Sequence, residues 1–190
     1  MVAADPATHG QLAAAIASSQ AWIPGRERTK TNNIRLIHEM RMPMRELGRL
    51  FDRDPSRALA AARGCGFVIG SELQAHGVDL TFAPVLDVDY GESSVIGDRA
   101  LHSDPNVIAK LAEALQAGLN ASGMTSVGKH FPGHGYVRAD SHLEIPVDER
   151  TLAEITARDI VPFRRLARAG MGAVMPAHVI YPKVDSKPAG

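Results

Sequence analysis

The residues best suited to chemistry lie together in the stretch Gly128–His142. It holds one lysine, three histidines and one aspartate: Lys129, His130, His134, His142 and Asp140. Glycine and proline interrupt the stretch every few residues, which predicts a loop rather than the interior of a helix or strand. The apolar run Met124–Val127 before it is typical of a buried strand. We therefore expect Lys129 and His130 where a strand ends and a long loop begins, the place where α/β enzymes put their active sites.

Three kinds of chemistry suit these residues. Zinc binding is one, since imidazoles and carboxylates are zinc ligands, but His130 and His134 flank Pro-Gly and so do not share a helical face, as paired ligands often do. A Schiff base on Lys129 is the second, and it would leave the neighbouring histidines without a purpose. The third is sugar binding with acid/base catalysis, in which Lys129 and His130 bind hydroxyl groups and Asp140 orients His142.

Composition limits the classes of protein to consider. The 190 residues are enough for one domain with a hydrophobic core. Lys+Arg and Asp+Glu both total 21, so no excess of positive charge favours nucleic acid or an anionic membrane as a partner. A lone cysteine excludes an internal disulfide, and no apolar run approaches the ~20 residues that span a bilayer. Without a signal-peptide pattern at the N-terminus, we expect a cytoplasmic protein, and a monomer.

Helices and strands alternate from Asp54 onward. Asp54-Pro55 and Asp104-Pro105 each place an N-cap before a proline at the first helical position, and Thr151–Glu154 is a capping box. The helices that begin there are expected to stop at glycines: Gly77, Gly123 and Gly170. The third should break or kink at Pro162. Apolar runs predict strands over 78–85, 124–127 and 172–176. Residues 1–42 show neither helical nor strand periodicity, apart from an Ala-rich stretch over 11–19.

This succession predicts the fold class. A helix, a glycine stop, an apolar strand and a polar residue recur three times at intervals of roughly 45–50 residues, as in a parallel α/β sheet. The apolar strands should be buried on both faces. Their exits carry Asp87, Lys129 with His130, and His178, all on one edge. Three strands are fewer than the eight of a closed barrel of about 250 residues. We therefore predict an incomplete (β/α)8 TIM-barrel-type domain that contains only central βα units.

The motifs of the chain resemble a known family. Gly128–Gly135, followed by Ala139–Glu144, is similar to the signature of family 3 glycoside hydrolases, specifically the bacterial β-N-acetylhexosaminidases (β-N-acetylglucosaminidases) of peptidoglycan recycling. The resemblance continues in the family's order and spacing through three more motifs: Phe82–Val88, Ile96–His102 and Met175–Tyr181. We accordingly divide the chain into a poorly matching N-terminal segment, 1–42, and a partial catalytic barrel, 43–190.

The resemblance implies a function and a set of site residues. It implies a hydrolase without cofactor or metal that removes terminal β-1,4-linked N-acetylglucosamine from muropeptides. By motif, Arg99, Lys129 and His130 bind the sugar, His142 is the general acid/base, and Asp140 is its partner. In this retaining mechanism His142 protonates the leaving oxygen and later deprotonates water, and an aspartate nucleophile attacks the anomeric carbon between those steps.

Two motifs of the family find no match in this sequence. The nucleophile belongs to a Ser-Asp-Asp-Leu type motif after a later strand, and the chain ends at Gly190 before such a motif. Upstream of Pro43, the segment Asn32–Met40 does not match the family's Asp-Gln-Glu-Gly-Gly-Arg motif. We therefore expect this chain alone to hydrolyse little or nothing, because removal of a nucleophile commonly costs several orders of magnitude in rate. The alternative to an active glycosidase is a catalytically inactive fragment that lacks the nucleophile.

Several residues near the strand exits also have structural interpretations. Asp87 is expected to orient its neighbours rather than touch substrate, and His134, between glycines, to brace the loop. Arg99 follows Gly97 and Asp98 in a loop at a strand exit, which favours ligand contact over a surface ion pair. His178 suits a hydrogen-bonded core histidine as well as a site residue. The acidic residues from 141 to 149 are interpreted as a solvated face.

Overall fold

The computed structural model describes residues 43–138 and 146–185, which all belong to the second of two units, residues 43–190. The described elements are, in chain order, α3 (Arg45–Arg53), α4 (Pro55–Ala75), β1 (Leu80–Thr81), the 3-10 helix η1 (Gly97–Arg99), α5 (Pro105–Ala121), β2 (Thr125–Phe131), α6 (Leu152–Arg158), α7 (Ile160–Arg168) and β3 (Ala173–Pro176). No helix in this part of the chain is long and apolar enough to cross a membrane. The separate segment expected over residues 1–42 lies outside the described residues and stays a prediction.

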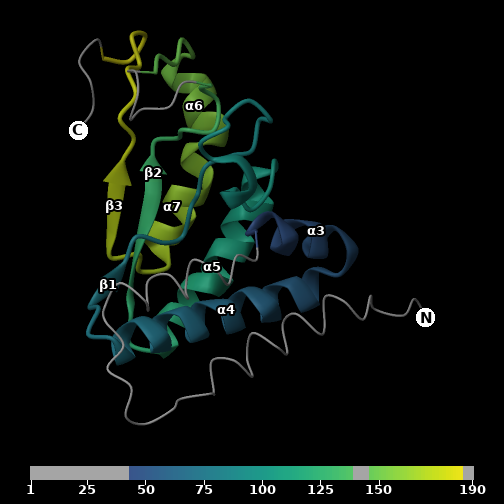
Figure 1. Cartoon of the computed structure of the whole chain (residues 1–190). Coiled ribbons are helices and arrows are strands. Elements are labelled where there is room, and N and C mark those ends of the chain that lie inside the picture. The colour runs from purple at the N-terminus through teal and green to yellow at the C-terminus, as the bar shows by residue number, and fades with distance from the viewer. Residues whose placement is uncertain (1–42, 139–145, 186–190) are drawn as a thin grey trace. The chain divides into compact units, whose positions relative to one another are not determined.

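The three strands form one parallel sheet in the order β1-β2-β3 (Figure 1). Leu80 lies opposite Thr125 in the first pair, and Val127 lies opposite Ala173 in the second. The connection from β1 to β2 contains α5, and the connection from β2 to β3 contains α6 and α7. Sequential parallel strands joined through helices are the βα units predicted from the sequence.

The helices begin and end where local side chains dictate. The Asp54 carboxylate accepts the Arg57 backbone N–H at 3.0 Å and caps α4, and Asp104 caps α5 in the same way. At α6 both bonds of the predicted capping box are present, between Thr151 and Glu154. The expected glycine stops are confirmed, since all three have a positive φ: Gly77, Gly123 and Gly170.

The third predicted helix breaks, but three residues before the proline. Asp159 separates α6 from α7 although its own dihedral angles stay helical (φ −69°, ψ −35°), and Pro162 lies inside the first turn of α7. A proline has no N–H to donate to the carbonyl four residues earlier, so the helix is interrupted upstream of it. In a first turn the missing N–H has no helical acceptor in any case, and Pro162 is tolerated there.

The loop predicted from Gly128 is wrong for its first four residues. β2 continues through Gly128, Lys129, His130 and Phe131. Its backbone is held on both sides, because Lys129 N–H donates to the Pro84 carbonyl and the Ala177 N–H donates to the Phe131 carbonyl. Pairing with two neighbouring chains therefore overrides the local preference of the glycine. The predicted sugar-binding residues Lys129 and His130 are among the last residues of a strand and do not lie in a loop.

Burial on both faces holds for the middle strand only. Ser126, Val127 and Gly128 of β2 are buried, whereas β1 is reduced to two residues with an isolated bridge at Val85. The outer strands leave apolar side chains exposed, among them Leu80, Phe82 and Val174. The prediction of continuous buried strands over 78–85 and 172–176 is therefore wrong for the strands at either side of β2.

Glycines allow the long helices α4 and α5 to approach each other closely. A Cβ atom on Gly118 would lie 2.0 Å from the Arg63 carbonyl oxygen, and one on Gly66 would lie 2.0 Å from the Leu115 carbonyl oxygen. The backbones of α4 and α5 are thus in direct contact at these two glycines. The apolar side of α5 then faces inward and supplies fully buried residues to the core: Ile108, Leu111, Leu115 and Leu119.

We predict that Gly118→Ala destabilises the fold. The added methyl group would meet backbone atoms, which cannot move aside as a flexible side chain can, so the free energy of unfolding should fall by about 1–3 kcal/mol. Gly64→Ala in α4 is the matched control, because its Cβ would have no atom within 4 Å and a helical Gly→Ala change stabilises by roughly 0.5–1 kcal/mol. Urea denaturation of both variants measures the difference; equal stability would contradict the close approach.

Candidate active site

A buried carboxylate organises the edge of the sheet where β1 and β2 end. Asp87 is 1% exposed, and three N–H groups surround it. The His130 ring nitrogen Nδ1 lies 2.7 Å from Oδ2, the His130 backbone N–H lies 3.3 Å from the same oxygen, and the His134 backbone N–H donates to Oδ1 at 2.7 Å. These contacts confirm the structural role predicted for Asp87.

The contact with Asp87 selects the form of the His130 ring. A carboxylate only accepts hydrogen bonds, so Nδ1 carries the proton in this pair. In the neutral imidazole the other nitrogen, Nε2, is then an acceptor for a hydroxyl group. The side chain keeps 19% of its surface exposed, so a ligand at the strand edge can reach it.

An irregularity in β2 places His130 in this position. Lys129 pairs with Met175 of β3 and Phe131 pairs with Pro176, so the register shifts across His130 and leaves it as the extra residue. Such a bulge leaves one residue outside the strand ladder and re-aims its side chain. Its backbone N–H turns to the Asp87 carboxylate instead of a neighbouring strand. One acid therefore stabilises both the bulge and the ring that the bulge presents.

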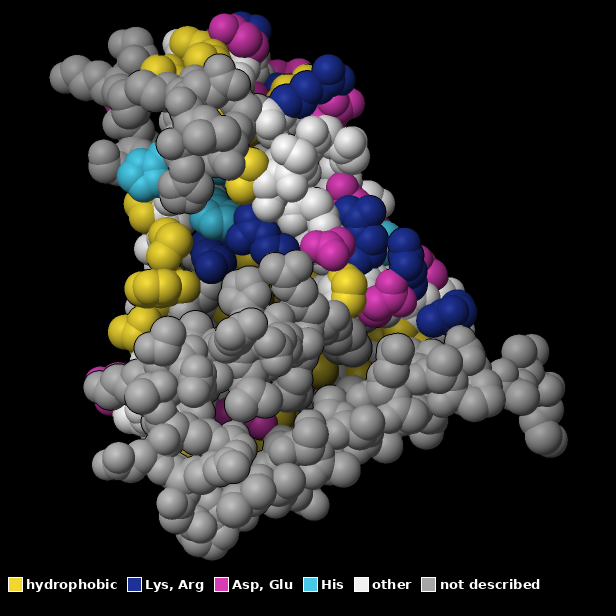
Figure 2. All heavy atoms as spheres, viewed as in Figure 1, with side chains coloured by type: hydrophobic (Ala, Val, Ile, Leu, Met, Phe, Trp, Pro, Cys, Tyr) yellow, Lys and Arg dark blue, Asp and Glu magenta, His cyan; other side chains and the backbone are white. Residues whose placement is uncertain are grey.

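Lys129 lies beside a second cation. Burial lowers the pKa of its ammonium group, the positive charge of Arg99 lowers that pKa further, and the Asp87 carboxylate opposes both effects. Lys129 and His130 are neighbours in β2, and Arg99 lies close enough for its charge to act on Lys129. Figure 2 shows Lys or Arg side chains next to His side chains on this face of the molecule.

Arg99 is presented by the loop that follows Asp87. It ends η1, where its guanidinium donates two hydrogen bonds to the Val95 carbonyl oxygen, at 3.1 and 2.6 Å, and its side chain stays exposed. Arg45 of α3 fixes the loop from outside, since it donates to the Gly97 carbonyl at 2.9 Å and forms an ion pair with Asp89. Arg99 is thus bound to its own loop rather than to a carboxylate, which favours the ligand interpretation.

The two remaining histidines of the strand exits differ in burial. His134 is only 3% exposed, burial lowers its pKa, and neither ring nitrogen has a hydrogen-bond partner within the described part of the chain. It contributes its backbone N–H to Asp87, which supports the predicted bracing role. His178 is exposed, so its interpretation as a core histidine is wrong.

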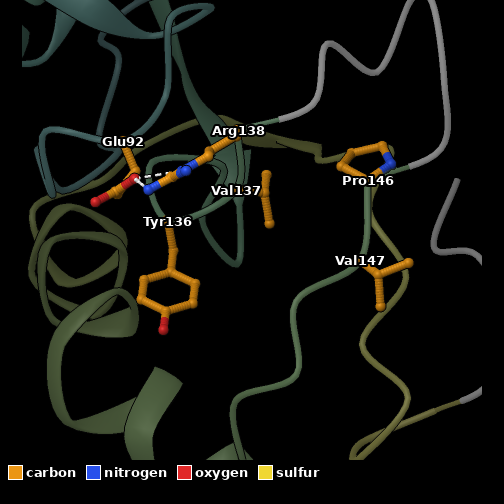
Figure 3. A pocket seen from close by; sticks show the side chains of 6 residues that line it. All are labelled: Glu92, Tyr136, Val137, Arg138, Pro146 and Val147. Atoms are coloured by element: carbon orange, nitrogen blue, oxygen red, sulfur yellow. Dashed lines mark hydrogen bonds and ion pairs between the residues drawn. The ribbon is translucent and has the colours of Figure 1, made fainter.

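The predicted acid/base residues Asp140 and His142 lie outside the described residues, but the flanks of their segment are described. On one flank Arg138 forms an ion pair with Glu92, and on the other the Ile180 N–H donates to the Pro146 carbonyl. Between the flanks is an open pocket of about 380 Å³ (Figure 3). Its wall consists of Glu92, Tyr136, Val137, Arg138, Pro146 and Val147.

Sequence reasoning missed a second group of buried charges. Asp148 and Asp159 are fully buried, and the Arg150 guanidinium binds both. The interpretation of residues 141–149 as a solvated face is therefore wrong for Asp148. The spacing Asp148-x-Arg150 directly before a capping box was the available signal. Among the described residues, no three His, Cys, Asp or Glu side chains are grouped so that they could hold a metal ion.

Comparison with known proteins identifies the family. Residues 36–190 match the glycosyl hydrolase family 3 N-terminal domain. The chain belongs to glycosyl hydrolase family 3. Beta-hexosaminidases of Nitrosospira multiformis and Chromobacterium violaceum are each 60% identical to it over 148 residues, which make up 78% of this chain and 42% of each relative. The chain thus spans about two fifths of the length of the curated relatives that it matches.

Solved structures of family 3 members confirm the fold class. The crystal structure of NagZ from Neisseria gonorrhoeae in complex with N-trifluoroacetyl-D-glucosamine superposes with a TM-score of 0.74 at 55% identity, over 76% of this chain and 43% of that chain. A family 3 β-N-acetylglucosaminidase from Paenibacillus sp. gives a TM-score of 0.65 at 34% identity, over 68% and 25%. The parallel α/β sheet is therefore part of a (β/α)8 barrel-type domain, as predicted.

We predict that Asp87→Asn lowers the free energy of unfolding by about 1–3 kcal/mol. An amide has one acceptor oxygen, and its NH₂ group would face a backbone or ring N–H of this family 3 site, which leaves a buried donor unsatisfied. Chemical denaturation measures the change, with Asp98→Asn in the exposed part of η1 as control. Equal stability of wild type and Asp87→Asn would show that the three N–H contacts contribute nothing.

A second prediction concerns charge. Arg99→Gln should raise the pKa of Lys129, because it removes a cation that disfavours the ammonium form. Titration of the lysine side chain by NMR gives the value, and Arg164→Gln on the exposed side of α7 should leave it unchanged. An unaltered Lys129 pKa in Arg99→Gln would mean that the two side chains do not share one site.

Proposed function

We propose that the chain is the N-acetylglucosamine-binding part of a family 3 β-N-acetylhexosaminidase that acts on terminal β-1,4-linked N-acetylglucosamine of peptidoglycan muropeptides. The observation that carries the proposal is the Asp87–His130 pair beside Lys129 and Arg99 at the exit edge of the sheet. In α/β barrels this edge is where substrates bind. The NagZ structure that matches over 76% of this chain holds an N-acylated glucosamine, which supports the choice of sugar.

The three proposed sugar-binding residues supply complementary hydrogen bonds. The Lys129 ammonium and the Arg99 guanidinium are donors without acceptor capacity, and they suit hydroxyl and carbonyl oxygens. His130 Nε2, with Nδ1 bound to Asp87, suits a hydroxyl proton. Burial around Lys129 strengthens such bonds, since water competes less for the donor. Together they can hold one sugar ring in a single orientation.

Hydrolysis is proposed to use His142 and Asp140. His142 protonates the leaving oxygen, an aspartate nucleophile forms the bond to the anomeric carbon, and His142 then takes a proton from the attacking water, so that configuration is retained. Of the residues that flank this pair in the sequence, Arg138 forms an ion pair with Glu92 and the Pro146 carbonyl accepts the Ile180 N–H. The nucleophile is not assigned to Asp87, whose oxygens are already bound by N–H groups.

The composition and the family also support proposals about partners, localisation, oligomeric state and cofactors. The chain carries no net charge, which gives nucleic acid and anionic membranes no electrostatic attraction. We propose a cytoplasmic monomer that needs no metal or cofactor, because the reaction uses only proton transfer and a carboxylate nucleophile.

A second candidate function is sugar binding without hydrolysis. It is favoured by the nature of the described site, where cations and imidazoles suit recognition and the buried carboxylate Asp87 is not free to attack a sugar. The same residues would then bind N-acetylglucosamine and leave the glycosidic bond intact.

Release of p-nitrophenol from its N-acetyl-β-glucosaminide tests the first function. If the chain turns over this substrate, His142→Ala should lower kcat by about 10²–10⁴-fold, the usual contribution of a general acid/base. His76→Ala, at an exposed position at the end of α4, is the control and should keep the wild-type rate. Turnover that survives in His142→Ala would contradict the assigned acid/base.

NMR titration with N-acetylglucosamine separates the two functions. Shifts at Lys129 and His130 in the absence of turnover would favour binding without hydrolysis. No binding and no turnover by a cooperatively folded chain would overturn both.

A further inference from the structure

Arg150 is the centre of the buried charge group that sequence reasoning missed. Its guanidinium donates to both oxygens of Asp148, from Nε at 3.0 and 3.1 Å and from Nη2 at 2.7 Å. Nη1 donates to Asp159 at 2.8 Å and to the Tyr90 hydroxyl at 2.9 Å. The Arg150 side chain is 10% exposed and both carboxylates are completely buried. Every nitrogen of the guanidinium is engaged.

The partners of Arg150 come from two connections of the sheet, the one between β1 and β2 and the one between β2 and β3. Tyr90 belongs to the loop after β1, Tyr136 follows β2, and Asp159 lies between α6 and α7. The guanidinium lies over both aromatic rings, 4.1 Å from the Tyr136 centroid and 5.0 Å from that of Tyr90. The rings meet edge to face with centroids 5.3 Å apart. The Arg150 side chain thus joins segments that are 69 residues apart in the sequence, at Tyr90 and Asp159.

Hydrogen bonds and charges around Arg150 determine which of its partners carry a proton. The Tyr90 hydroxyl donates to Asp159 at 2.9 Å, and burial together with the Asp159 charge raises the pKa of Tyr90 to about 12. The phenol therefore stays protonated and keeps its donor. Burial raises the pKa of Asp159, and the bond and charge of Arg150 oppose that rise. The acid depends on Arg150 to stay ionised.

Contacts lead from this group to the sugar site. A Cβ atom on Gly133 would lie 2.6 Å from Asp159 Oδ1, so the carboxylate rests directly against the turn after β2. The Tyr181 hydroxyl, in the segment that follows β3, donates to the carbonyl of the same glycine, Gly133, at 2.8 Å. The next residue, His134, gives its N–H to Asp87, which holds His130. On the β1 side, Asp89 is the neighbour of Tyr90 and pairs with Arg45, which supports the η1 loop.

We propose that Arg150 is a positioning residue that holds the loops after β1 and β2 at the spacing in which Arg99, Lys129 and His130 bind one sugar. The role rests on the proposed function of those three residues. Arg150 acts through Asp159, Tyr90 and Tyr136, and does not touch the sugar. A lysine could not replace it, since one ammonium cannot reach two carboxylates and a hydroxyl in the planar fork that a guanidinium provides.

The test compares Arg150→Lys with Arg165→Lys in the whole chain. Arg165 of α7 also donates two hydrogen bonds to a carboxylate, that of Glu113, at 3.0 and 2.6 Å. The control variant therefore loses a similar two-bond contact, but outside the loops that follow β1 and β2. We expect Arg150→Lys to weaken N-acetylglucosamine binding about tenfold, the effect of a loosened support on a preorganised site. Amide hydrogen exchange should accelerate about tenfold in residues 87–99 and 132–138 and stay unchanged in α4 and α5. Arg165→Lys should show neither effect.

Two results would overturn the positioning role. One is wild-type sugar affinity together with wild-type exchange in both loops of Arg150→Lys; the other is exchange that accelerates equally in α4, α5 and the loops, which is the mark of a general loss of stability. If the wild-type chain does not bind the sugar, the proposed function is wrong, and the exchange pattern still decides the role of Arg150. Should Arg150→Lys not fold, Tyr136→Leu, which keeps both ion pairs, must give the same loop-specific pattern.

Discussion

A charge that is removed from water must be compensated within the protein, and the described part of the site is built around one such charge, the Asp87 carboxylate. Its position after β1 is fixed by strand pairing. The N–H groups that compensate it belong to the bulge of β2 and to the turn beyond. The bulge and the orientation of the His130 ring thus both serve to satisfy one acid. This acid has a structural task and a chemical one at once, since it also stabilises the neighbouring ammonium group.

A second compensated centre lies at Arg150, and it differs in kind. Around Asp87 the compensation comes from N–H dipoles, whereas the single positive charge of Arg150 pairs with two carboxylates and lies over two aromatic rings. The turn Gly133–His134 touches both centres. A disturbance at either one is therefore transmitted to the other through two residues of backbone. This coupling explains how a network that does not reach the ligand edge can influence it.

Sequence alone predicted what is determined locally. The caps at Asp54, Asp104 and Thr151 and the three glycine stops depend on residues within one turn, and each was found as predicted. The extent of β2 was misjudged, because the hydrogen bonds that keep Gly128–Phe131 extended come from chains more than 40 residues away. The family motifs assigned Arg99, Lys129 and His130 to one sugar site, and that assignment stays a prediction. The Arg150 group could not be foreseen in detail, since its partners are recognised only once the β1–β2 and β2–β3 connections are folded against each other.

The contact of Arg45 with the loop after β1 has a consequence for how this domain can be divided. Arg45 lies in α3, before the first complete helix–strand unit, yet it binds the Gly97 carbonyl 52 residues later and neutralises Asp89. A fragment that started at α4 would keep all three strands and the Asp87–His130 pair, but it would free the loop that carries Arg99. A fragment in which the loop of Arg99 keeps this support therefore has to include α3.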